Sequence, residues 1–237
     1  MIRVVRARLE VVADARGSER GLSLAELLVA MTVFGILLAM TAGFMVNASR
    51  ANITNRTIDS TNRTAANAMD EVTRVLRGAA TNTVANQSLP DPAFAQATDN
   101  ALTVYSYVDL STSKVAPVKV QFFVDASKNL VEWKWAATPA GVNFTFPSSA
   151  SCATSCTSRI LGSPVVLPAA GGPKLFTYLD STGTAIATVG GVLPAAVVNN
   201  VAAVTISLQF GSTSSANQST LLTNSVGLPN LNVARTN

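Results

Sequence analysis

The sequence predicts an α+β protein, in which a long N-terminal α-helix packs its outer half on an antiparallel β-sheet. Three observations predict this class. Apolar residues are densest between Leu22 and Val46, the stretch from Asn47 to Arg77 contains neither proline nor glycine, and beyond Pro92 the apolar period changes to two. With 237 residues, the chain is long enough for one domain with its own core and one appended segment.

The first segment, residues 1–21, is polar and carries five arginines and three acidic residues. It lacks the long apolar run of a secretory signal, so we interpret it as a cytoplasmic leader. The next segment, residues 22–46, reads LSLAELLVAMTVFGILLAMTAGFMV and contains one ionisable side chain, Glu26. As a helix it would span about 37 Å, enough to cross a bilayer core of about 30 Å.

Membrane topology is predicted from the five arginines of residues 1–21, which precede the apolar segment. The positive-inside rule therefore places the leader in the cytoplasm and everything after Val46 outside the cytoplasmic membrane. Residues 47–78 continue as the amphipathic outer half of the helix, and Gly78 ends it. Their apolar positions recur at roughly helical intervals: Ile53, Ile58, Ala65, Met69, Val72, Val75 and Leu76.

Residues 79–237 are expected to form an extracytoplasmic, β-rich head. The predicted strands are Ala101–Val108, Val118–Val124, Leu130–Trp135, Lys174–Asp180 and Val201–Phe210, with a hairpin across residues 125–129. In the last strand Val204, Ile206, Leu208 and Phe210 alternate with polar residues, which is typical of a sheet with one buried face. Residues 137–173 contain half of the ten prolines and are expected to be one long irregular excursion.

Composition excludes several classes of function. The formal net charge of +4 is too weak to indicate a nucleic-acid-binding surface, and half of it belongs to residues 1–21. The chain has no histidine, which excludes histidine-dependent triads and histidine-ligated metal sites. The acidic residues are scattered, without the spacing of a calcium loop or of paired catalytic carboxylates. We therefore expect no enzymatic activity, no metal site and no cofactor.

The most informative motif is Gly21-Leu22-Ser23-Leu24-Ala25-Glu26, which opens directly into the apolar helix. A carboxylate inside a membrane helix costs several kcal/mol unless it is paired, so Glu26 is a functional residue by default. Inside an apolar bundle, an opposite charge close to the carboxylate would satisfy it.

This motif resembles the processing site of type IV prepilins and of type II secretion prepseudopilins. The resemblance implies that a prepilin peptidase cuts between Gly21 and Leu22, and that the new amine of Leu22 is methylated. Glu26 then matches the glutamate that pairs with the N-terminal amine of an adjacent subunit. Leucine at position 22 is a mild departure, because phenylalanine is commoner there. Two alternatives stay open: an uncleaved signal anchor, and a cleavable secretory signal with a weak site near residues 46–48.

The rest of the chain resembles this family only in pattern, being most similar to the larger minor pilins and J-type minor pseudopilins. The resemblance implies a structural subunit of a type IV pilus or type II secretion-like filament, assembled through its N-terminal helix. Its partners would be prepilin peptidase, other pilin subunits, the assembly platform and the cytoplasmic membrane. The alternative is an anchored extracytoplasmic module, such as an adhesin, that uses the helix only as a tether.

Three further features have more than one interpretation. Cys152 and Cys156 lie outside the membrane in the predicted topology, which favours a disulfide over free thiols. The aromatic residues Trp133, Trp135, Tyr105 and Tyr107 lie on adjacent predicted strands, or close to them. They could form a surface-binding patch, but cross-strand packing is the favoured interpretation. Gly43 could be a point of bending or a position of close helix packing.

Overall fold

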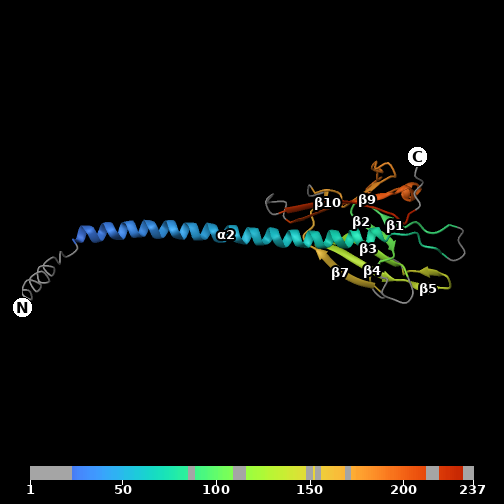
Figure 1. The fold of residues 1–237 in the computed structure, drawn as a ribbon, viewed down its shortest axis with the longest axis horizontal. Helices are drawn as coiled ribbons and strands as arrows, with labels where there is room; N and C mark the ends of the chain where they lie inside the picture. Colours follow the sequence, from blue (N-terminus) through green and yellow to red (C-terminus); the bar gives the residue numbers. More distant parts are fainter. Residues whose placement is uncertain are drawn as a thin grey trace, which may run out of the picture. The chain divides into compact units, whose positions relative to one another are not determined.

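A computed structural model describes residues 23–84, 89–108, 116–147, 152, 156–168, 172–211 and 219–231. It consists of one long helix followed by antiparallel strands, so the predicted α+β class is confirmed (Figure 1). The elements are α2 (Leu24–Arg77), β1 (Phe94–Ala97), β2 (Ala101–Ser106), β3 (Val118–Val124), β4 (Leu130–Ala136), β5 (Thr138–Ala140), β6 (Asn143–Thr145), β7 (Cys156–Gly162), β8 (Phe176–Leu179), the 3₁₀-helix η2 (Ala195–Asn200), β9 (Ala203–Gly211) and β10 (Ser219–Gly227). The chain divides into two compact units, Met1–Ile53 and Thr54–Asn237.

The described residues of the second unit form three antiparallel sheets. A five-stranded sheet has the order β1-β2-β3-β4-β7, a three-stranded sheet has the order β10-β9-β8, and β5 and β6 form a short hairpin. The hairpin predicted across residues 125–129 is confirmed: β3 and β4 pair in register, and Asp125 accepts hydrogen bonds from Asn129 that close the turn. After β7 the chain runs beside β9, where Val165 bridges Phe210, and so connects the two larger sheets.

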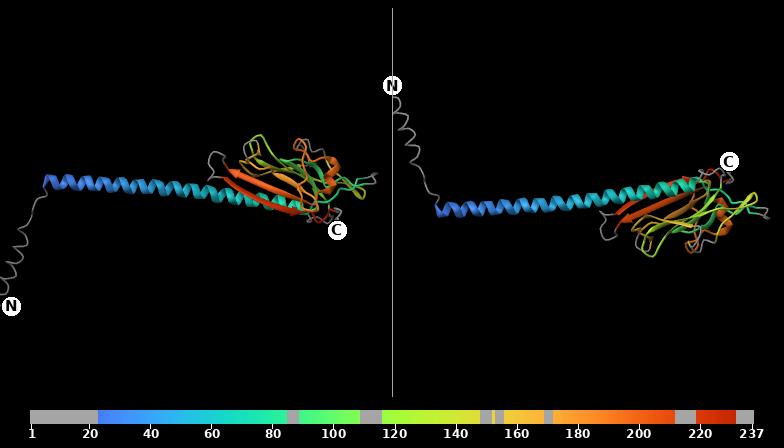
Figure 2. Two further views of the ribbon diagram at one scale, coloured as in Figure 1. Left: turned by 90° about the horizontal axis from the view of Figure 1, so that it is seen from above. Right: turned by 90° about the horizontal axis from the view of Figure 1, so that it is seen from below.

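The outer part of α2 lies beside the strands (Figure 2), and one hydrophobic core joins it to both larger sheets. It includes Val72 and Leu76 of the helix, Val120 and Phe122 of β3, and Ile206 of β9, all fully buried. On β9 the residues predicted to face inward all enter this core, and on β3 the alternate residues Val118, Val120 and Phe122 do so. Full burial on the helix begins at Ala65, which is later than the start of the predicted amphipathic half at residue 47. The helical periodicity therefore located the correct face but not the point where packing begins.

The helix ends at Arg77, as predicted, and Gly78 follows for a steric reason. A Cβ atom at position 78 would lie 2.6 Å from the Ser106 Oγ and 3.1 Å from the Tyr107 carbonyl oxygen. The Ser106 hydroxyl donates a 2.6 Å hydrogen bond to the Val75 carbonyl, so β2 approaches the last turn very closely. A side chain at position 78 would separate the strand from the helix end.

Several strands lie where the sequence did not predict them. The excursion predicted to be irregular over residues 137–173 contains β5, β6 and β7, so that prediction was wrong. In β7 most side chains are exposed because it is an edge strand, and it lacks the apolar alternation on which strand prediction depends. β1 and β10 were missed for the same reason, since both are edge strands with several exposed positions.

Candidate functional site

The start of α2 is a capping box formed by Ser23 and Glu26. The Glu26 backbone N–H donates a 3.1 Å hydrogen bond to the Ser23 Oγ, and the Ser23 N–H donates a 3.2 Å bond to the Glu26 Oε2. The two residues thus satisfy backbone donors that a helix start otherwise leaves unpaired. Ser-x-x-Glu before an apolar run is a recognisable sequence signal for this structure, so Glu26 has a role within its own helix in addition to the predicted intermolecular one.

The capping box fixes where the Glu26 carboxylate lies. It is held in the first turn of the helix, where the partial positive charge of the helix N-terminus favours an anion. The predicted cleavage residues Gly21 and Leu22 lie outside the described residues, as does the leader. The structure therefore describes the carboxylate of the predicted pair, but not the amine.

The surface of α2 between Leu24 and Val46 is exposed and almost wholly apolar. The exposed large side chains include Leu24, Phe34, Met40, Phe44 and Met45. By length and composition this is the one helix among the described residues that could cross a membrane: an 18-residue window has a mean hydropathy of 2.3, and none of it is buried. An apolar surface of this size needs either lipid or other protein to cover it.

The hydroxyl groups in this surface are bonded within the helix itself. Thr32 Oγ1 donates to the carbonyl oxygens of Leu28 and Val29, at 3.1 and 2.8 Å, and Thr41 Oγ1 donates to that of Leu38 at 3.0 Å. These bonds remove the polarity that a hydroxyl would otherwise present to hydrocarbon. Beyond the capping box, this part of the helix is thus compatible with an apolar environment.

Glycine does not interrupt the helix at either of its two positions here. α2 continues through Gly35 and Gly43, and a Cβ atom at either position would meet nothing within 4 Å. Together with Ala39 they place small residues at intervals of four along one helix face, a spacing that permits close approach of a second helix. This geometry favours packing over bending at Gly43.

The two cysteines form a disulfide in the structure. Cys152 and Cys156 are bonded across a Cα–Cα distance of 5.2 Å, at the point where β7 begins. Within the described ranges, His, Cys, Asp and Glu side chains form no group of three or more that could hold a metal ion. The disulfide closes a small loop, and its position at the N-terminal end of β7 is consistent with a structural role.

The aromatic residues considered for surface binding are mostly engaged in packing. Trp135 is fully buried, and Trp133 packs edge-to-face against both Trp135 and Phe123. Lys119 is only 4% exposed; its Nζ lies 4.9 Å from the centre of the Trp135 ring and donates to the Pro147 carbonyl oxygen. Burial lowers the pKa of Lys119 below its ordinary value. This cluster attaches the segment after β6 to the outer face of the five-stranded sheet.

A comparison with known families identifies the start of the chain. Residues 16–42 match a family model described as the prokaryotic N-terminal methylation motif. This N-terminal segment is type IV prepilin-like. The match includes Gly21, Leu22 and Glu26, together with residues 24–42 of the exposed apolar surface. No curated protein matches the chain in sequence. The prepilin-like motif implies processing by prepilin peptidase, assembly with other pilins and anchoring in a membrane.

Proposed function

We propose that this protein is a minor pilin or pseudopilin, a non-enzymatic subunit of a type IV pilus or type II secretion-like filament. The observation that carries the proposal is the joining of a prepilin-like motif to a continuous apolar helix surface that no other part of the described chain covers. A tether needs only enough apolar length to cross the bilayer. A filament subunit needs, in addition, a helix surface that can exchange lipid for the helices of other subunits.

The proposed maturation begins with hydrolysis of the peptide bond between Gly21 and Leu22. This step removes residues 1–21 as the leader and frees the α-amine of Leu22, which is then methylated. Residues 22–46 would cross the cytoplasmic membrane, residues 47–78 would form the outer half of the helix, and residues 79–237 would form the head outside. The processed subunit would then leave the membrane at the assembly platform and enter the extracytoplasmic filament.

Glu26 would contribute the negative charge that pairs with the N-terminal amine of an adjacent subunit during assembly. Its carboxylate is held in the first helical turn by the Ser23 N–H, close in sequence to the new amine. In an apolar bundle the attraction between an amine and a carboxylate offsets the cost of removing both charges from water. Because this attraction requires the two groups to be close, the pair favours one axial register of adjacent helices. Cleavage would create the positively charged α-amine of Leu22 with which the Glu26 carboxylate of an adjacent subunit would pair.

Substitution at the cut tests the proposal directly. We expect Gly21→Leu to remain uncut in cells with a working prepilin peptidase and to be absent from sheared filaments. Gly17→Leu, in the same leader, should be cut normally and serves as the matched control. For the wild type, mass spectrometry should find Leu22 as the first residue, carrying a methyl group on its amine.

Two outcomes would contradict the proposal. A mature chain that begins at a residue other than Leu22 would refute the cleavage site. A second outcome is that the uncut Gly21→Leu variant keeps the full binding activity of the head at the cell surface, while no filament contains the wild-type chain. The helix would then be only a tether, as in an anchored surface-binding module.

A further inference from the structure

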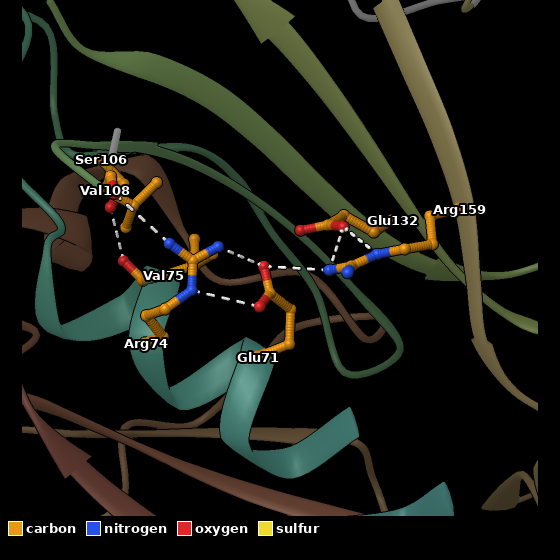
Figure 3. A network of polar contacts seen from close by, with 7 residues as sticks. All are labelled: Glu71, Arg74, Val75, Ser106, Val108, Glu132 and Arg159. Atoms are coloured by element: carbon orange, nitrogen blue, oxygen red, sulfur yellow. Dashed lines mark hydrogen bonds and ion pairs between the residues drawn. The ribbon is translucent and has the colours of Figure 1, made fainter. Parts of the chain in front are cut away.

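A network of four charged side chains joins α2 to the five-stranded sheet (Figure 3). Arg159 of β7 contacts two carboxylates through one nitrogen, since its Nη2 lies 2.8 Å from Glu132 Oε2 and 3.1 Å from Glu71 Oε1. Its Nε also donates to Glu132 Oε2, at 3.0 Å. Arg74 holds Glu71 from the other side, with Nη2–Oε1 and Nε–Oε2 distances of 2.5 and 3.1 Å. The helix and strands β4 and β7 therefore share one charge cluster with no formal net charge.

The carboxylates lie inside this cluster and the guanidinium groups reach them from its rim. The side chains of Glu132 and Glu71 are 6% and 16% exposed, whereas those of Arg159 and Arg74 are 56% and 48% exposed. On β3 the residue paired with Glu132 is the fully buried Phe122. Other charged groups nearby are the half-buried Lys134 on the same face of β4, and Asp70 and Arg77 at exposed positions of α2.

The two acids are not electrostatically equivalent. Burial raises the pKa of Glu132 above its ordinary value; Arg159 offsets part of this rise, and the adjacent Glu71 adds to it. Burial also acts upward on Glu71, but its hydrogen bond from Arg74, the hydrogen bond that a protonated Glu132 can donate to it and the charges of both arginines hold its pKa below its ordinary value. A proton taken up by the pair therefore goes first to Glu132.

We propose that Glu71 and Glu132 act as a carboxyl pair that takes up one proton while the helix and the sheet stay joined, which makes this attachment tolerant of mild acid. On acidification Glu132 binds a proton from solvent and becomes neutral. Its new O–H donates to the Glu71 carboxylate, which keeps its contacts with both arginines. One hydrogen bond between strand and helix thus replaces the ion pair that Glu132 loses. In the topology proposed above, the head lies outside the cytoplasm and is therefore exposed to the pH of the surrounding medium.

The direction of the effect on stability differs between the two acids. Because the pKa of Glu132 is raised in the folded state, its contribution to stability increases as the pH falls through that raised value. Because the pKa of Glu71 is lowered, its contribution is present above the unfolded value and is lost as the pH falls through the lowered one. From the raised pKa of Glu132 down to the ordinary value of 4.5 the attachment should not weaken. From 4.5 down to the lowered pKa of Glu71 its contribution is lost progressively, and below that pKa both arginines lose the Glu71 anion.

Titration of the full chain in detergent micelles tests the proposal. With ¹³C-labelled glutamate side chains, we expect one carboxyl to titrate above the ordinary value of 4.5 and to disappear in Glu132→Gln, and one to titrate below 4.5 and to disappear in Glu71→Gln. Glutamine at position 132 can donate to Glu71 as the protonated acid would. The Tm of Glu132→Gln at neutral pH should therefore equal or exceed that of the wild type.

Thermal unfolding of the variants separates this pair from an ordinary salt bridge. Glu71→Gln should lower Tm by roughly 5–10 °C at neutral pH, because it leaves both arginines without their shared anion. Asp70→Asn, at the adjacent exposed position, should leave Tm and both titrations unchanged. The proposal is overturned if Glu132→Gln lowers Tm as much as Glu71→Gln does, or if both carboxyls titrate at ordinary values. The wild-type titration decides the question even if Glu71→Gln fails to fold.

Discussion

Substitution of Gly162 by alanine tests the close approach of three elements in the core of the head. Gly162 is the last residue of β7 and lies where this strand meets both β9 and α2. A Cβ atom at this position would lie 2.5 and 2.7 Å from Cε1 and Cζ of the Phe210 ring, and 2.8 Å from Thr64 Cγ2. All three distances are shorter than van der Waals contact between carbon atoms, so either the ring or the strand must move.

The size of the effect follows from how little Phe210 can move. Its side chain is 1% exposed and belongs to the main core, so a shift of the ring displaces other buried residues. Adding one carbon to a well-packed core typically costs about 1–3 kcal/mol. For a unit of this size that corresponds to a fall in Tm of about 3–10 °C.

The assay is thermal unfolding of the full chain in micelles, with Gly227→Ala as the matched control. Gly227 is the last residue of β10, and a Cβ atom there would meet nothing within 4 Å. Alanine at position 227 should leave Tm unchanged or raise it slightly, because it reduces the conformational entropy of the unfolded chain. Equal Tm values for Gly162→Ala and Gly227→Ala would refute the packing argument.

Two further predictions concern the helix start and the buried lysine. Ser23→Ala should remove about 0.5–2 kcal/mol of local helix stability and speed hydrogen exchange at the Glu26 amide, whereas Ser23→Thr should preserve slow exchange; an unchanged Ser23→Ala rate would argue against the capping box. For Lys119, burial favours the neutral amine, so the free energy of unfolding should rise as the pH increases from its lowered pKa toward the ordinary 10.5. Lys119→Met should abolish that rise in denaturant titrations, and a wild-type profile that is flat over this range would contradict it.

The sequence by itself determined the features that depend on local periodicity. Apolar density and the absence of proline and glycine from residue 47 to Arg77 predicted the helix, and Gly78 predicted where it ends. Period-two alternation predicted β3 and the inward face of β9. The Ser-x-x-Glu spacing also indicates the capping box, because the two residues that form this cap are three positions apart.

Only the tertiary structure decided which polar residues are buried and which strands close the sheets. Edge strands such as β7 and β10 have many exposed side chains and no strong apolar alternation in sequence, so their pairing with β4 and β9 defines them. Glu71 and Arg159 are far apart in sequence, and neither residue type indicates a buried network. Gly162 is required by the ring of Phe210, which no local pattern encodes. Local propensity depends on a few adjacent residues, whereas burial and charge pairing depend on whatever the fold brings into contact.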